Sequence, residues 1–418
     1  MRIIKNITNL IKYTYQDNLY RNGIHLMLTN IVTGLFGFVF LMIATRLYSS
    51  QDVGMYSALF SVISLIVLFS VGGFSNTIIR LVPTASQPDR NKLIFSSFVI
   101  MCFTVMIVSL IFVFFIDVFS PKLIFLKDLF YGFIFILFTV FAGIYTLFNG
   151  VFMAFRKTQY ILINNIITNI GKIFLLPSFV SLLYIGIFYS AGIATFLGVV
   201  ICLFLLYEAK LIKNFKLSMN FDIIKKNFKY ILTNYFSSIA SQLFGLLLPI
   251  LILNILFAEI TAYFFIAWTI FSIITQMTMS IIMSFFVEGS YKEDEIKKNR
   301  NKGLKAALII ATISVIGVFL FGKFLLSLFG EEYLNSLNLL YVFAISIYFF
   351  VVNKIYLVEL LIKKKMKETI IFNFLITIPT IIFGTLLMFY FGLMGVGYGW
   401  LIGQLIGIIW ILARLKLS

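Results

Sequence analysis

The stretch RLYSSQDVGMYSALF, residues 46–60, is a polar interruption in a chain that is otherwise rich in Phe, Ile, Leu and Val. Asp52 stands where a new apolar run begins. We therefore expect it to cap the N-terminus of a helix and to face the positive end of the helix dipole. A similar phrase, LFAEITAYFF, returns at 256–265, so that Asp52 aligns with Glu259 at an offset of 207 residues. This repetition predicts a chain built from two similar halves.

The composition around this stretch indicates that lipid is the main solvent of the chain. The 418 residues are 61% hydrophobic and 12% charged, with a mean hydropathy of +1.06, whereas soluble domains carry about 25% charged residues. A membrane-spanning helix needs about 20 mostly apolar residues, and twelve stretches fit this length. We therefore expect an all-α polytopic membrane protein. Its predicted spans are 23–48, 53–79, 93–116, 129–154, 160–184, 186–207, 230–255, 260–286, 306–322, 337–362, 369–391 and 395–413.

The distribution of basic residues predicts the orientation of these spans. Of the 33 Lys and Arg residues, 27 fall on the side of the two termini, four on the opposite side, and two, Lys172 and Lys354, within spans. Basic loops stay inside, so we expect both termini in the cytoplasm and the chain in the plasma (inner) membrane. The same rule explains the net charge of +17 without nucleic acid as a partner.

Twelve spans divide evenly at the repeat. We expect a cytoplasmic amphipathic N-terminus (1–22), an N-lobe of helices 1–6 (23–207), a cytoplasmic linker (208–229) and a C-lobe of helices 7–12 (230–418). Six helices per half make the halves parallel repeats, which are typical of transporters with a substrate site between the halves. In the last span, glycines spaced by four predict a smooth ridge for close helix packing, made of Gly395, Gly399, Gly403 and Gly407.

The run TRLYSSQDVGMYSALFSVISLIVLFSVGGFSNTIIRLVP, residues 45–83, resembles the first two helices of polysaccharide-export flippases of the multidrug/oligosaccharidyl-lipid/polysaccharide exporter superfamily. The matching pieces are Arg46-Leu47 at the end of helix 1, the acid-x-Gly-x-Tyr start of helix 2, and Arg80 near its inner end. The resemblance implies a V-shaped exporter fold of two lobes around a central cavity. It also implies a cargo of O-antigen type, an oligosaccharide on a polyprenyl diphosphate, flipped to the outer leaflet by alternating access.

Charged and polar residues within spans indicate where such a cargo would bind, because buried charge is costly in a membrane. Lys172 lies near the middle of predicted helix 5 and shares a helical face with Asn165, Thr168 and Asn169. This stripe suits a path for a diphosphate, or alternatively a hydrogen-bonded seam between helices. Lys354, with Asn353 beside it, is the second deep cation.

The other candidate binding residues are less distinctive. Arg46 and Arg80 sit at helix ends, where they either anchor the helix at the interface or meet the anionic head. Glu359 is expected to pair with Lys363 four residues later, although a role for it in proton coupling stays open. The last three candidates are His25 in helix 1, Gln242 in helix 7 and Gln276 in helix 8.

Two other functions remain open at this stage. A multidrug or cation antiporter of the same superfamily would need a deep carboxylate, for which Glu359 is the candidate. A membrane-embedded polysaccharide polymerase or ligase would need a sizeable outer loop, and the predicted outer loops are short. We expect a non-enzyme without catalytic, metal or cofactor sites. Its partners would be the lipid-linked oligosaccharide, membrane lipid, a coupling proton or sodium, and the glycan polymerase machinery.

Overall fold

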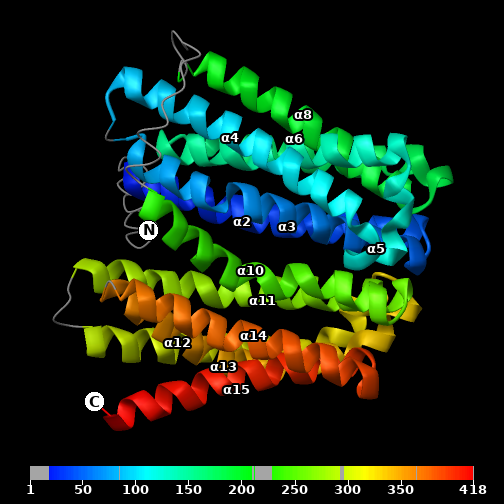
Figure 1. Ribbon diagram of the computed structural model, residues 1–418. Coiled ribbons are helices and arrows are strands. Elements are labelled where there is room, and N and C mark those ends of the chain that lie inside the picture. The colour runs from blue at the N-terminus through cyan, green and yellow to red at the C-terminus, as the bar shows by residue number, and fades with distance from the viewer. Residues whose placement is uncertain are drawn as a thin grey trace, which may run out of the picture.

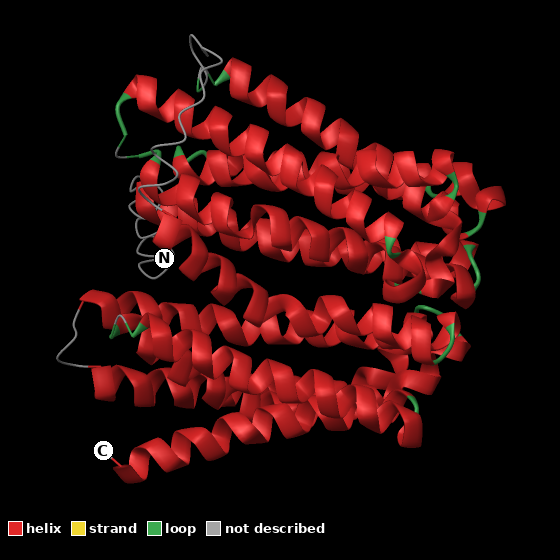
Figure 2. Cartoon of the chain, viewed as in Figure 1, coloured by secondary structure: helices red, strands yellow, loops and turns green. Residues whose placement is uncertain are grey.

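The computed structural model describes residues 18–83, 85–209, 211, 228–291, 296–363 and 365–417, with the side chains of 18–27 and of some other residues in these ranges left out. The described residues form helices and short connections, with no strand among them (Figures 1 and 2). The long helices are α2 (Asn18–Leu47), α3 (Ser50–Leu81), α4 (Gln87–Phe114), α6 (Leu129–Ala154), α7 (Thr158–Leu175), α8 (Tyr184–Glu208), α10 (Phe228–Ile255), α11 (Ala258–Tyr291), α12 (Ile296–Ser327), α13 (Leu337–Ile362), α14 (Met366–Phe391) and α15 (Leu393–Leu417). The short elements are α5 (Ile116–Phe119) and the 3₁₀ helices η1 (Pro121–Lys127), η2 (Pro177–Leu182) and η4 (Glu331–Ser336).

The long helices account for the predicted spans. Eleven of them, within the described ranges, are long and apolar enough to cross a membrane. The remaining long helix, α7, is outside that set because Gln159, three asparagines and Lys172 lower its hydropathy. The predicted all-α polytopic membrane fold is confirmed, and the chain is a multi-pass membrane protein.

The twelve long helices of the described residues form two bundles of six. Helices α2 to α8 pack on one another, as do α10 to α15, and α3 joins the bundles by packing along α10 and α11. Both ends of the described chain lie at the left in Figure 1; we call this the terminal end and the opposite one the far end. The outer helices α8 and α15 spread apart toward the terminal end, which gives the molecule its V shape (Figure 1).

Three predicted boundaries need correction. Predicted span 160–184 is not one helix, because α7 stops at Leu175 and Pro177 begins the 3₁₀ helix η2. Lys172 therefore lies in the last turn of α7, near the far end, and not near the middle of a helix. Predicted spans 260–286 and 306–322 are too short at their facing ends, because the described residues of 287–305 extend α11 to Tyr291 and begin α12 at Ile296. The predicted linker falls mostly outside the described residues.

The polar stretch that opens the sequence caps α3, but the N-cap is Ser49 and not Asp52, which is the third residue of the helix and completes a capping box. The Ser49 hydroxyl accepts a hydrogen bond from the backbone N–H of Asp52, and the Asp52 carboxylate accepts one from the N–H of Ser49. The same carboxylate accepts the N–H of Tyr184 at the start of α8, at 2.9 Å. Asp52 thus satisfies orphan donors at the N-termini of two helices, which fixes the far end of the first bundle.

The four glycines of α15 pack closely, as the sequence predicts. An added Cβ at Gly399 would lie 2.2 Å from the backbone of Gly384 in α14, and one at Gly403 would lie 1.7 Å from the hydroxyl of Thr380. An added Cβ at Gly395 would likewise clash with the backbone of α14, and one at Gly407 would clash with the side chain of Asn353 in α13. The ridge therefore brings α15 into backbone contact with α14 and sets one wall of the second bundle.

Gly403→Leu is expected to destabilise the protein by about 3 kcal/mol, because the added side chain must push α15 off α14. Thermal unfolding of the detergent-solubilised protein measures this. The matched control is Gly317→Leu in α12, where no atom lies within 4 Å of an added Cβ. Equal melting temperatures for the two variants would show that the ridge does not hold these helices together.

Candidate functional site

A cavity of about 1200 Å³ lies between the two bundles. Both bundles line it, with helices α2, α3, α6 and α7 on one side and α10, α11, α13, α14 and α15 on the other. About half of the described lining residues carry polar side chains. They are Thr29, Asn30, Thr33, Ser61, Asn149, Asn165, Asn169, Lys172, Ser241, Gln242, Thr269, Ser272, Thr275, Gln276, Asn353, Lys354, Asn373, Thr377, Thr380 and Gln404.

Lys172 and Lys354 are the charged residues of this lining, one from each bundle, and no Asp or Glu accompanies them among the described residues. Neither ammonium has a carboxylate partner in the described part of the chain. The Lys354 ammonium lies 5.4 Å from the centroid of the Phe350 ring, which offers a weak cation–π contact. The cavity therefore carries two basic groups that no acid of its lining offsets.

The asparagines of α7 stand beside Lys172. Asn169 donates to the backbone carbonyl of Asn165, and Asn165 donates to that of Ile161, so each amide keeps its carbonyl oxygen for another donor. The Thr33 hydroxyl of α2 lies 3.4 Å from the Asn165 carbonyl oxygen. Thr168 does not share this face of α7, because it packs against Gly198 of α8.

Asn353 lies in the cavity wall with little exposed surface, since it is 1% exposed. Its amide donates to both the backbone and side-chain oxygens of Gln404 in α15, at 2.9 Å each. Its own carbonyl oxygen has no hydrogen-bond partner among the described atoms, and the same holds for the Asn149 carbonyl oxygen in α6. The Asn353 oxygen lies against Gly407 of α15, where an added Cβ would approach it to 2.6 Å, so Asn353 helps to hold α13 against α15.

Aromatic rings form the wall of the second bundle. Phe244, Trp268, Phe271 and Trp400 all line the cavity. The Trp400 ring centroid lies 4.7 Å from that of Phe244 and 5.2 Å from that of Trp268. The Trp400 indole N–H donates to the Ser346 hydroxyl, which holds this wall in one orientation. The cavity thus combines cations, amides and flat apolar faces.

Hydrogen bonds join the two bundles at the far end. Arg46 of α2 donates to the carbonyl oxygens of Ser327 and Leu328, at 3.1 Å each. Gln51 donates to Glu259 at 2.8 Å, so the two copies of the repeated motif meet directly. The other bonds of this group, which we call the far-end latch, are Ser50 to Glu332, Ser120 to Asn254, Asn254 to the carbonyl of Phe119, and Lys122 to the carbonyl of Leu256.

Close packing supports the far-end latch. An added Cβ at Gly54 in α3 would lie 1.7 Å from the carbonyl oxygen of Ala258 at the start of α11. The Tyr48 hydroxyl donates to the carbonyl of Leu176, and burial together with the nearby Asp52 carboxylate raises the pKa of Tyr48 to about 12. Burial also lowers the pKa of Lys122.

The lining is more closed at the far end than in its middle. Phe40 and Tyr56, toward the far end, are each 5% exposed, whereas Thr33, Gln242 and Gln276, near the middle of their helices, are exposed. Together with the far-end latch, this burial shuts the cavity at the far end.

The predicted site residues divide into two groups. Those that line the cavity are Lys172, Lys354, Asn165, Asn169, Asn353, Gln242 and Gln276. Arg46 belongs to the far-end latch, and Arg80, in the last turn of α3, lies at the terminal end outside the lining. His25 lies in α2, but its side chain is outside the described part. Glu359 pairs with Lys363, as predicted, and with Arg300, away from the cavity.

Comparison with solved structures identifies the fold. The chain superposes on the lipid II flippase MurJ in an inward closed conformation with a TM-score of 0.76 and 16% identity, over 93% of this chain and 87% of that one. The inward-facing conformation of a multidrug resistance MATE family transporter of the MOP superfamily gives 0.74 and 14%, over 94% and 98%. A MOP superfamily transporter from Pyrococcus furiosus gives 0.62 and 15%, over 96% and 95%.

Comparison by sequence gives the family. No curated protein matches the chain significantly. A family model described as polysaccharide biosynthesis protein matches residues 19–287, more than half of the chain. This match confirms the resemblance carried by residues 45–83. The chain therefore belongs to the polysaccharide biosynthesis protein family and has the fold of MOP-superfamily transporters.

Proposed function

We propose that the protein flips a polyprenyl-diphosphate-linked oligosaccharide, such as an O-antigen or polysaccharide repeat unit, from the cytoplasmic to the outer leaflet by alternating access. The observation that carries this proposal is the cavity between the bundles, which Lys172 lines from one bundle and Lys354 from the other, without an acid in the described lining. A multi-pass chain of the polysaccharide biosynthesis family needs a wet path for an anionic, sugar-bearing head, because such a head cannot cross hydrocarbon unaided.

The size and lining of the cavity suit this cargo. Its volume of about 1200 Å³ exceeds the range of about 300–1,000 Å³ that small-molecule sites occupy, which leaves room for several sugar units. Amide groups on α7 and α10 can exchange hydrogen bonds with sugar hydroxyls. The aromatic wall around Trp268 and Trp400 offers flat faces for the apolar C–H faces of sugar rings. One solved structure of the same fold is a flippase of lipid II.

The two lysines lie at different depths. Lys354 is eight residues from the terminal end of α13 and Lys172 is fourteen residues from that end of α7, which corresponds to about 12 Å and about 21 Å along the helices. With the terminal end in the cytoplasm, the diphosphate meets Lys354 first and Lys172 deeper. The bundles then part at the far end, so that Arg46 loses its carbonyl acceptors and can meet the diphosphate. Arg80 and His25, at the terminal end, are proposed to attract the head at the start.

Depletion of the protein in its host is expected to leave the lipid-linked oligosaccharide in the inner leaflet. Spheroplasts of depleted cells should accumulate this lipid, and a membrane-impermeant sugar oxidant should fail to modify it. In cells that make the protein, a large part of the pool should be oxidised.

The outcome also separates this function from a multidrug antiporter. Unchanged surface glycan in depleted cells, combined with new sensitivity to cationic dyes, would contradict the flippase and favour the antiporter.

A further inference from the structure

A second pocket, of about 490 Å³, lies at the terminal end of the second bundle. The helices α12, α13 and α15 and the start of α14 contribute to it. It is separate from the central cavity, because it uses the opposite face of α13. Val352, Ile355, Tyr356 and Glu359 face this pocket, whereas Phe350, Asn353, Lys354 and Leu357 face the central cavity.

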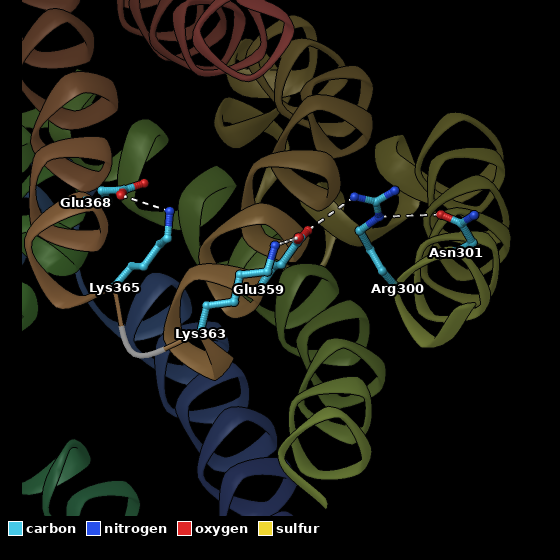
Figure 3. A network of polar contacts seen from close by, with 6 residues as sticks. All are labelled: Arg300, Asn301, Glu359, Lys363, Lys365 and Glu368. Atoms are coloured by element: carbon cyan, nitrogen blue, oxygen red, sulfur yellow. Dashed lines mark hydrogen bonds and ion pairs between the residues drawn. The ribbon is translucent and has the colours of Figure 1, made fainter. Parts of the chain in front are cut away.

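The rim of the pocket is basic. Its described lining contains four basic residues, Arg300, Lys363, Lys365 and Arg414, and two acidic ones, Glu359 and Glu368. Glu359 receives both Lys363 at 2.5 Å and Arg300 at 3.3 Å, and Lys365 reaches Glu368 at 3.1 Å (Figure 3). The pocket thus holds two positive charges more than its carboxylates neutralise.

These cations keep donors for a ligand. Arg300 uses one terminal nitrogen on Glu359 and its Nε on Asn301, while a guanidinium has five N–H donors. Arg414 lies 5.0 Å over the ring of Trp410, and stacking leaves its in-plane donors open. Lys363 and Lys365 are 44% and 49% exposed. All four are therefore accessible to an anion.

The floor of the pocket is apolar. Leu304, Ile355, Leu360 and Ile411 line it. Leu360 and Ile411 also belong to a small apolar cluster that is separate from the main core. An apolar floor beneath a basic rim, at the level where these spanning helices end, matches the shape of a phospholipid at the membrane surface. Basic pockets between membrane helices bind anionic head groups in this way.

We propose that this pocket binds an anionic glycerophospholipid. Its phosphodiester contacts Arg300, Lys365 and Arg414, and one acyl chain lies along Leu304, Ile355 and Leu360. The bound lipid ties α12 and α15, which both pack on α13, to the start of α14. This site is independent of the cargo proposed for the central cavity.

The test is lipid retention by the purified full-length protein, measured by native mass spectrometry during titration with phosphatidylglycerol or phosphatidylcholine. We expect phosphatidylglycerol to bind with clear preference. Because each basic residue near a membrane surface adds to the attraction of an anionic lipid, the double variant Arg300→Gln with Arg414→Gln should bind phosphatidylglycerol about 10- to 30-fold more weakly. The matched control, Lys302→Gln with Lys367→Gln, removes the same charge from residues outside the pocket and should bind as the wild type does.

A substitution that is expected to strengthen lipid binding distinguishes a binding role of these residues from a merely structural one. Glu359→Gln releases Arg300 and Lys363 from their carboxylate and should strengthen phosphatidylglycerol binding, whereas loss of structure would weaken it. If the double variant does not fold, the single variant Arg414→Gln, at an exposed position of α15, replaces it in the binding measurement. Equal binding of the two lipids by the wild type, or equal loss in the double and control variants, would overturn the proposal. So would displacement of phosphatidylglycerol by millimolar glycerol phosphate, which would assign the pocket to a soluble phosphate.

Discussion

Replacing Lys172 and Lys354 together by alanine is expected to reduce delivery of the surface glycan at least 100-fold at an unchanged amount of protein in the membrane. Both side chains line the cavity between the bundles, and the described lining holds no other charge. A hydrogen bond to a charged group contributes about 1.5–3 kcal/mol, so each lysine alone should account for about a 10- to 100-fold change. Lectin staining of intact cells, normalised to immunoblots of membranes, measures the loss.

Two controls show whether charge in the cavity causes the effect. Lys323→Ala removes another lysine from a spanning helix, but Lys323 is exposed and outside the lining, so delivery should stay normal. Lys172→Arg and Lys354→Arg keep the charge and should retain measurable delivery. Normal delivery by the double alanine variant would rule out the two lysines as the binding site for the head.

Gly54→Ala is expected to prevent the far end from closing. Alanine normally stabilises a helix interior relative to glycine, so the substitution should not harm α3 itself. Its methyl group, however, would lie 1.7 Å from the Ala258 carbonyl oxygen, about half an ordinary van der Waals distance. The added methyl group and the Ala258 carbonyl oxygen are both fixed by the helix backbones, so neither can move aside and the bundles must separate. A protein that cannot close its far end cannot complete alternating access.

Cross-linking across the far-end latch measures this change. Gln51→Cys and Glu259→Cys, introduced where the native side chains lie 2.8 Å apart, should be joined by a short bifunctional thiol reagent in a background with Cys102 and Cys202 replaced. Gly54→Ala should lower the yield at least fivefold and abolish glycan delivery. Gly317→Ala, with nothing within 4 Å of the added Cβ, should change neither. An unchanged yield in the Gly54 variant would show that close contact at Gly54 is not needed for closure.

Much of the fold follows from local sequence patterns. Runs of about 20 apolar residues locate the helices, and the cap formed by Ser49 and Asp52 is visible in the chain because all its partners lie within four residues. The glycine ridge of α15 is equally local, since a spacing of four places Gly395 to Gly407 on one face. Such features depend on periodicity and short-range hydrogen bonds alone.

Other features depend on contacts that no local pattern contains. The far-end latch pairs Arg46 with carbonyls 281 and 282 residues away, and backbone acceptors leave no mark in a sequence. The sequence puts Lys172 near the middle of a helix because the apolar run continues past Pro177, although α7 ends at Leu175 and Pro177 begins a 3₁₀ helix. The sequence does not identify Asn149 and Gln404 as cavity residues. A lone amide in an apolar helix gives the same sequence pattern whether it faces a cavity or a neighbouring helix.

Flipping by the purified protein in liposomes tests the central claim most directly. A fluorescent polyprenyl-diphosphate oligosaccharide is placed in both leaflets, and a membrane-impermeant quencher then reports the fraction that reaches the outer one. Wild-type protein should bring nearly the whole pool within reach of the quencher, while the variant with Lys172→Ala and Lys354→Ala should leave the inner half protected. If wild-type liposomes keep the inner half protected, or if the variant flips as fast as the wild type, a lysine-bearing path between the bundles is not how this protein works.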